Sequence, residues 1–171
     1  MATQAQAADS GPSLGAKLGA LAFWLIAAGL ILILAPIENQ PPMIWVLRGL
    51  ALFIWLMMGL QLIFREKQRA AAGLDLDRDA TPFDYWTIAH TWAGVVFGIF
   101  GIPWWLVAVL TIAWEIFEWA VPGFGETETF ANRVVDIAVA WVAWILVAGG
   151  VALVSQTDMP WFIPSIDSLV R

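Results

Sequence analysis

Long apolar runs that recur along the chain constrain the fold more than any other feature of this sequence. Five of them stand out, at about 18–35, 43–64, 83–100, 104–121 and 132–154. A helix of about 20 apolar residues spans a hydrocarbon core about 30 Å thick, and the runs lack the strict alternation of a transmembrane β-barrel. Hydrophobic residues make up 61% of the chain and charged residues 13%. The sequence therefore predicts an all-α membrane protein with five transmembrane helices.

Polar stretches around these runs divide the 171-residue chain into segments. Residues 1–17 are mostly small or polar, lack the basic start of a signal peptide, and are predicted to form a disordered tail. We expect 18–64 to form a transmembrane hairpin and 65–80 a cytoplasmic loop. The same reasoning predicts a three-helix transmembrane core over 81–154 and an interfacial C-terminal tail over 155–171.

The basic residues predict the orientation, because cytoplasmic loops carry an excess of lysine and arginine. In a five-helix arrangement, six basic residues fall on one side: Lys17, Arg65, Lys67, Arg69, Arg78 and Arg133. Only Arg48 and Arg171 fall on the other side. The N-terminus is therefore predicted in the cytoplasm and the C-terminus outside, as in a multi-pass protein of the plasma (inner) membrane. Arg48 lies near the start of its helix, so its side chain is expected to reach the interface.

Twelve tryptophans make the chain tryptophan-rich. Some are placed to form aromatic belts, with Trp104, Trp105 and Trp161 near the outer boundary and Trp86 and Trp119 near the inner one. Others must lie deeper, namely Trp114, Trp141 and Trp144. We expect these deeper rings to pack between helices or against lipid, in preference to holding a pigment or cofactor.

Several classes of function are excluded by what the sequence lacks. There is no cysteine, so disulfides, thiolate metal sites and cysteine nucleophiles are excluded. The basic residues form no patch large enough to bind nucleic acid. The sequence also has no Gly-rich phosphate loop, no G-x-S-x-G, no HExxH and no pair of haem-type histidines. A named reaction is therefore not predicted by any of these motifs.

Polar residues from three predicted helices share one depth in the membrane. His90, Glu115 and Asp136 each lie about 5–10 Å inside the cytoplasmic boundary, at 1.5 Å of rise per residue. Each lies on a stripe of polar or small residues at helical spacing: Thr87, His90 and Gly94; Thr111, Glu115 and Glu118; Thr129, Asn132 or Arg133, Asp136 and Ala140. Charges that face lipid are costly, so we expect these side chains to turn inward and meet. The small residues Gly94, Gly98 and Ala140 would let the backbones of these helices approach closely.

Simpler interpretations stay open for several of these residues. His90, the only histidine, also fits a role in holding two helices together, and Glu118 and Arg133 also fit positions at the interface. Gln61 is expected at a similar depth. The loop residues Glu126 and Glu128 are more typical of solvated side chains. Three residues fit helix caps: Asp84, and Thr127 or Thr129 for the last helix.

Four kinds of chemistry fit this set of side chains. A divalent cation such as Mg, Mn or Zn is one, with the metal ligands predicted to be His90, Glu115, Glu118 and Asp136. Acid–base catalysis on a lipid-linked substrate is another, with His90 as the base, a carboxylate orienting it and Arg133 holding a phosphate. A proton or ion path is the third, and a purely structural polar network is the fourth.

The order of these polar residues resembles that of the VanZ-like group of small polytopic membrane proteins. It is carried by the stretches DYWTIAHTWAG, WEIFEW and ETETFANRVVDIAV, over about residues 84–150. The matching positions are His90, Glu115, Arg133 and Asp136. The chain departs from the family pattern at Val139 and Ala143, where an acid and an asparagine are expected, and at Glu118, where a glutamine is expected. The resemblance implies a place at the cell envelope, with a link to glycopeptide resistance, more than a particular reaction.

Three functions follow from these observations as hypotheses. The first is a polar, cation-binding site at the cytoplasmic leaflet that binds or acts on a lipid-linked or head-group substrate, with catalytic residues His90, Glu115, Asp136 and Arg133. The second is a non-catalytic accessory subunit of a larger membrane complex, for instance a photosynthetic or respiratory one. The third, a proton-coupled carrier, is disfavoured because five short spans show no inverted repeat.

Overall fold

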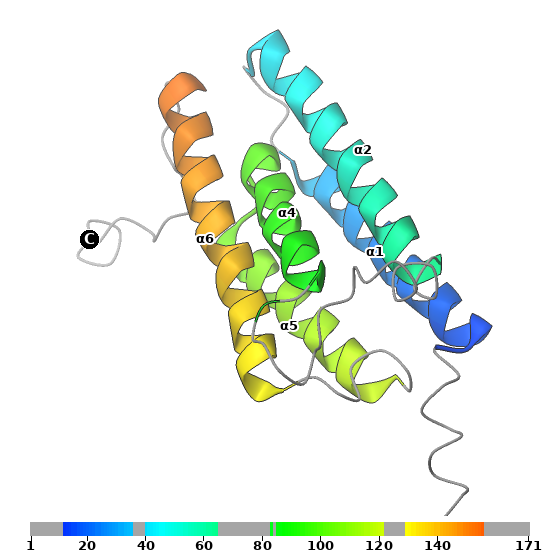
Figure 1. Ribbon diagram of the computed structural model, residues 1–171. Coiled ribbons are helices and arrows are strands. Elements are labelled where there is room, and N and C mark those ends of the chain that lie inside the picture. The colour runs from blue at the N-terminus through cyan, green and yellow to red at the C-terminus, as the bar shows by residue number, and fades with distance from the viewer. Residues whose placement is uncertain (1–11, 36–39, 65–82, 84, 122–128, 156–171) are drawn as a thin grey trace, which may run out of the picture.

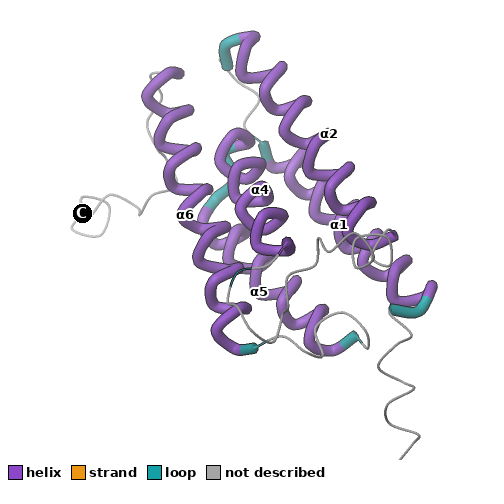
Figure 2. Tube along the Cα trace, in the orientation of Figure 1, coloured by secondary structure: helices purple, strands orange, loops and turns teal. Residues whose placement is uncertain are grey.

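The computed structural model describes residues 12–35, 40–64, 83, 85–121 and 129–155. All regular structure in these ranges is helical (Figure 2). The helices are α1 (Leu14–Leu34), α2 (Pro42–Phe64), α4 (Tyr85–Phe100), α5 (Trp104–Ala120) and α6 (Phe130–Ser155). The predicted all-α class is confirmed, and each helix begins and ends within a few residues of the apolar run that predicted it.

Short polar side chains set two of the helix starts. The Ser13 side chain accepts a hydrogen bond of 3.1 Å from the backbone N–H of Ala16, which caps α1. The helix therefore begins at Leu14 instead of at the first residue of the apolar run. Thr129 caps α6 in the same way, because its hydroxyl accepts from the N–H of Asn132 at 3.2 Å. The threonine cap predicted for the last helix is thus confirmed at Thr129.

Three of the helices are long and apolar enough to cross a membrane. They are α1 with 21 residues, α2 with 23 and α6 with 26. The other two are shorter: α4 has 16 residues and α5 has 17. A turn at Gly101, whose positive φ of 67° suits a residue without a Cβ, joins α4 to α5 as a helical hairpin. This hairpin turns back below the upper ends of α2 and α6 (Figure 1).

Helices α4 and α6 lie against each other because small residues line their contact. A Cβ built on Gly94 would lie 2.1 Å from the carbonyl oxygen of Ala140. One built on Gly98 would lie 2.7 Å from the Val147 Cβ. The backbones therefore approach more closely than any larger residue would allow, as predicted for the small residues of these two helices.

Two side chains from neighbouring helices bind the α4–α5 turn. Arg48 on α2 donates to the carbonyl oxygen of Ile99 at 3.1 Å, and Trp144 on α6 donates to that of Ile102 at 2.9 Å. Arg48 is only 2% exposed, and its guanidinium lies over the rings of Trp45 and Phe100. The expectation that Arg48 reaches the interface is therefore wrong. The backbone carbonyls at the end of α4 attract the cation inward.

Aromatic rings fill the space between the α1–α2 hairpin and the other helices. Trp24 stacks on Trp55 with ring centroids 4.5 Å apart, and Trp114 meets Phe23 edge to face at 5.2 Å. The deep tryptophans Trp114 and Trp144 are buried, as predicted for packing between helices. Trp86 was expected in the inner aromatic belt, but it is 3% exposed and belongs to this packed interior.

Candidate functional site

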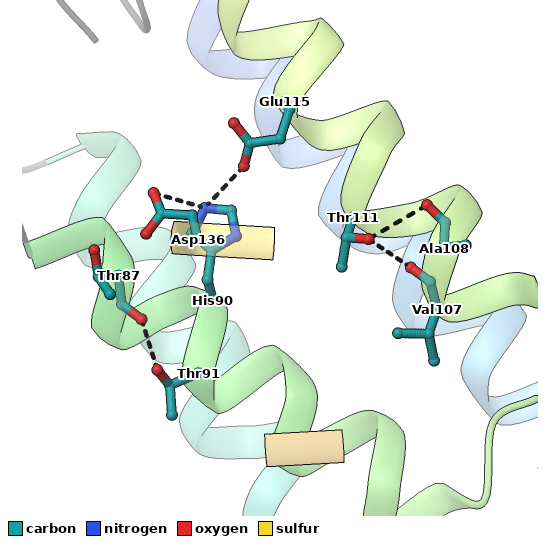
Figure 3. A network of polar contacts seen from close by, with 8 residues as sticks. All are labelled: Thr87, His90, Thr91, Val107, Ala108, Thr111, Glu115 and Asp136. Carbon is teal, nitrogen blue, oxygen red and sulfur yellow. Dashed lines mark hydrogen bonds and ion pairs between the residues drawn. The ribbon is translucent and has the colours of Figure 1, made fainter. Parts of the chain in front are cut away.

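Three helices bring His90, Glu115 and Asp136 together (Figure 3). The Nε2 atom of His90 on α4 lies 3.7 Å from Oε1 of Glu115 on α5 and 3.8 Å from Oδ2 of Asp136 on α6. All three side chains are buried, with Asp136 fully enclosed. The convergence predicted from helical spacing and depth is therefore present in the structure.

Glu118 completes this set, which we call the histidine–carboxylate cluster: His90, Glu115, Glu118 and Asp136. Glu118 is 0% exposed. Ligand atoms of His90, Glu115 and Glu118 all lie within 4.8 Å of one another. Glu118 follows Glu115 by three residues on α5, so both carboxylates point to the same side of that helix. The interpretation of Glu118 as a side chain at the interface is wrong, because neither carboxylate oxygen reaches the surface.

The cluster concentrates negative charge away from water. Three ionised carboxylates around one imidazole carry three negative charges, and like charges at this separation disfavour simultaneous ionisation. Arg133 lies one turn before Asp136 on α6, is half-buried and adds one positive charge nearby. With neutral His90 and all three carboxylates ionised, the cluster and Arg133 together would carry a net charge of −2. A divalent cation, or protons, would balance this charge.

The distances from His90 Nε2 are longer than hydrogen bonds and are within the range for two ligands of one metal ion. An N–H···O hydrogen bond has an N···O distance of about 2.7–3.2 Å. Two ligand atoms each about 2.1 Å from one metal ion are about 3.4 Å apart at a tetrahedral angle and about 4.2 Å apart on opposite sides of the ion. The observed 3.7 and 3.8 Å lie between these limits. One nitrogen and several carboxylate oxygens suit Mn or Zn, and with added waters Mg.

The structure buries only some of the other polar residues that were predicted near the site. Thr87 and Thr111 are buried, and the Thr111 hydroxyl donates to the carbonyl of Val107 at 2.8 Å. Asn132 is 1% exposed and lies one turn before Asp136 on α6. Gln61, which was expected at a similar depth, is different because its side chain is exposed on α2. Asp84, Glu126, Thr127 and Glu128 lie outside the described residues.

A cavity of about 40 Å³ lies beside the cluster, and the sequence did not predict it. His90 and Thr111 contribute polar groups to its wall. Most of the remaining lining is aromatic: Phe23, Trp24, Trp55, Trp86, Phe97 and Trp114. These rings come from four helices far apart in the sequence, and only the high tryptophan count hinted at such a place. We call this space the aromatic cavity.

Comparison with protein-family models, with curated proteins and with solved structures gives no match to the chain.

Proposed function

We propose that the histidine–carboxylate cluster binds a divalent cation and, through it, the head group of a lipid-linked substrate at the cytoplasmic leaflet. The observation that carries this proposal is the position of His90 Nε2, 3.7 and 3.8 Å from carboxylates on two other helices. Both distances lie within the 4.0 Å limit of an ion pair and are longer than a hydrogen bond. An imidazole nitrogen placed between two carboxylates, with a third nearby, has the composition and spacing of a cation site.

Charge supports the same proposal. Burying ionised groups is costly unless the opposite charge is close, and within a membrane the cost is greater. When the three carboxylates are ionised, the cluster and Arg133 together carry a net charge of −2. A divalent cation would neutralise this charge. Such a cation would also bind phosphate oxygens and polarise them. A lipid head group that carries phosphate is therefore the substrate class that suits both the charge and the location.

The chain's own residues have separate roles in this proposal. Glu115, Glu118 and Asp136 would hold the cation from α5 and α6. His90 would be the fourth ligand and would fix the ion against α4. Arg133, half-buried at the start of α6, would bind a second oxygen of the same phosphate. This arrangement orients a head group, and it agrees with the cell-envelope location that the VanZ-like resemblance implies.

The orientation of the chain belongs to the proposal too. The excess of basic residues near the starts of α1 and α6 and after the end of α2 favours the cytoplasm for that side. In that orientation the cluster lies in the cytoplasmic half of the plasma (inner) membrane. A phosphate-bearing head group of that leaflet would then lie close to the cation.

Elemental analysis of the detergent-purified protein tests the cation site directly. After incubation with Mn²⁺ or Zn²⁺ and removal of free ions, we expect close to one ion per chain. Glu115→Gln and Asp136→Asn should each lower the affinity at least tenfold. Thr111→Val is the matched control, since Thr111 lies one turn before Glu115 and its hydroxyl is bonded to the Val107 carbonyl. It should retain the ion.

A wild-type protein that stays free of metal with Mn²⁺, Zn²⁺ and Mg²⁺ would refute the cation site. The cluster would then be a structural network balanced by protons. The accessory-subunit function would become the better account, and the search would turn to membrane proteins that co-purify with the chain.

A further inference from the structure

The lining of the aromatic cavity continues from His90 of the cluster to Phe97, which lies closer to the centre of the membrane in the proposed orientation. On α4 the cavity is lined by one helical face that includes His90, Ala93 and Phe97. The rise from His90 to Phe97 is about 10 Å. Its polar end is therefore at the depth of the carboxylates, and its other end is deeper and apolar. This is the polarity that a lipid has from its head group to its chain.

A second cavity, of about 180 Å³, lies between α1 and α2. Its lining is apolar and consists of Leu21, Trp24, Leu25, Leu56, Gly59, Leu60 and Ile63. Leu25 and Leu60 are also exposed on the outer surface of these helices, which would face lipid in a membrane. We call this space the hairpin cavity. Trp24 lines both cavities, so its indole ring is a wall between them.

The position of Trp24 depends on the absence of a side chain at Gly59. A Cβ built on Gly59 would lie 2.3 Å from the Trp24 ring, so only glycine leaves room for the indole there. The ring also stacks on Trp55 at 4.5 Å and meets Trp114 edge to face at 6.0 Å. Trp24 is thus held between α2 backbone and two aromatic side chains. Movement of this single ring would join the two cavities.

We propose that one hydrocarbon chain of a lipid enters between α1 and α2 and occupies the aromatic cavity, with Trp24 displaced. The proposal rests on the proposed function, because the head group of this lipid would lie at the cation site. Hydrocarbon fits the lining better than water does, since a buried water needs two to four polar partners. The aromatic cavity alone, at about 40 Å³, is too small for a chain. Joined to the hairpin cavity, it has a route to the bilayer.

Photo-crosslinking tests this inference on the full chain. The protein is placed in phosphatidylcholine nanodiscs that contain a minor fraction of phosphatidic acid with a diazirine in its acyl chain. After illumination, adducts are mapped by mass spectrometry. We expect adducts on Ala27 and Phe97, which line the aromatic cavity, in addition to adducts on the exposed Leu146 of α6.

Two variants should change the adducts in opposite directions. Trp24→Ala removes the wall and should raise labelling of Phe97 several-fold. Ala93→Phe fills the cavity and should abolish it, while labelling of Leu146 stays constant. Gly49→Leu is the control for an added side chain, because a Cβ at Gly49 meets nothing within 4 Å. It should label like the wild type.

Adducts confined to lipid-exposed residues, in both the wild type and Trp24→Ala, would overturn the proposal. Metal content measured on the same nanodiscs separates this result from failure of the proposed function. Bound cation without cavity adducts would refute the lipid chain alone. Cavity adducts without cation would leave the chain pocket in place and refute the cation site.

Discussion

Buried charges in this protein are compensated in two different ways. Arg48 is compensated by backbone, because the last carbonyls of α4 carry partial negative charge and accept its hydrogen bonds. Glu118 and Asp136, both 0% exposed, lie among other carboxylates. The first arrangement places a cation against carbonyl dipoles, whereas the second places carboxylates of like charge close together. Substitutions at the two places should therefore have opposite consequences for stability.

Arg48→Leu should destabilise the protein. It leaves the carbonyls of Ile99 and Phe100 without their charged donor in a region that excludes water. Hydrogen bonds to charged groups contribute about 1.5–3 kcal/mol, and we expect a loss of that size. Unfolding in mixed micelles measures it, with Arg48→Lys as the control that should recover part of the loss. An unchanged unfolding free energy would show that the carbonyls find other donors.

Glu118→Gln should stabilise the protein without cation and weaken its response to cation. The substitution removes one negative charge from a buried group of like charges. In the wild type, a cation at one hundred times its dissociation constant should add about 2.7 kcal/mol of stability. Melting temperatures with and without Mn²⁺ measure both effects. A melting temperature that Mn²⁺ raises equally in the wild type and in Glu118→Gln would remove Glu118 from the site.

His90, Glu115 and Asp136 could be predicted from the sequence because a charged residue in an apolar helix must face inward, and helical rise gives its depth. Arg48 followed the same pattern, yet its partners are backbone carbonyls, which carry no sequence signal. Trp24 was equally unpredictable. Its role depends on which remote rings and which glycine it meets, and this is decided by tertiary packing.

At the scale of helices, boundaries were predictable because apolar runs stop at proline, glycine or charge. The exception, α1, begins earlier than its apolar run because Ser13 supplies a cap. Helix packing was predictable only in part. Gly94 suggested close approach, and the structure identifies α6 as the partner. Since Asp136 lies on α6 one turn before Ala140, this contact also sets the distance from Asp136 to His90.

Gly94→Ala should therefore damage both the fold and the site. The added methyl group would meet the Ala140 carbonyl oxygen, and relieving that clash must separate α4 from α6. Overpacking of this kind costs about 1–3 kcal/mol. We expect lower stability in micelles together with weaker cation binding.

Gly150→Ala on α6 is the matched control for that substitution. A Cβ there meets nothing within 4 Å, and alanine favours helix over glycine by about 1 kcal/mol. Its stability should be equal or higher, with unchanged cation binding. If Gly94→Ala behaved like Gly150→Ala, the close contact of α4 and α6 would not determine the geometry of the site.

The whole molecule divides, over the described residues, into three long helices and one shorter hairpin. The Arg48 side chain, which binds the turn between α4 and α5, lies on α2 about 9 Å below the start of that helix. The turn is therefore covered by protein, and Ile102 within it is 0% exposed. Carbonyls at such depth need donors from side chains, which Arg48 and Trp144 supply. Of the five predicted spans, three correspond to helices long and apolar enough to cross a membrane, whereas α4 and α5 are shorter and form a hairpin.

Introduced cysteines can test the proposed orientation, because the chain has none of its own. Met43, at the start of α2, and Phe130, at the start of α6, are both exposed. In intact cells an impermeant maleimide should label Met43→Cys and spare Phe130→Cys. Inverted membrane vesicles should reverse the result. Labelling of Phe130→Cys in intact cells would place the cluster in the outer leaflet and contradict the proposed substrate location.

The short hairpin also bears on how the protein is made. Both ends of α4–α5 face the same side of the membrane, so in the proposed orientation His90, Glu115 and Glu118 enter from the cytoplasm and return toward it. The insertion machinery never has to carry these groups through the apolar core to the far side. In the same orientation Asp136, near the start of α6, would also stay on the cytoplasmic side. None of the four side chains of the histidine–carboxylate cluster would then have to cross the membrane during insertion.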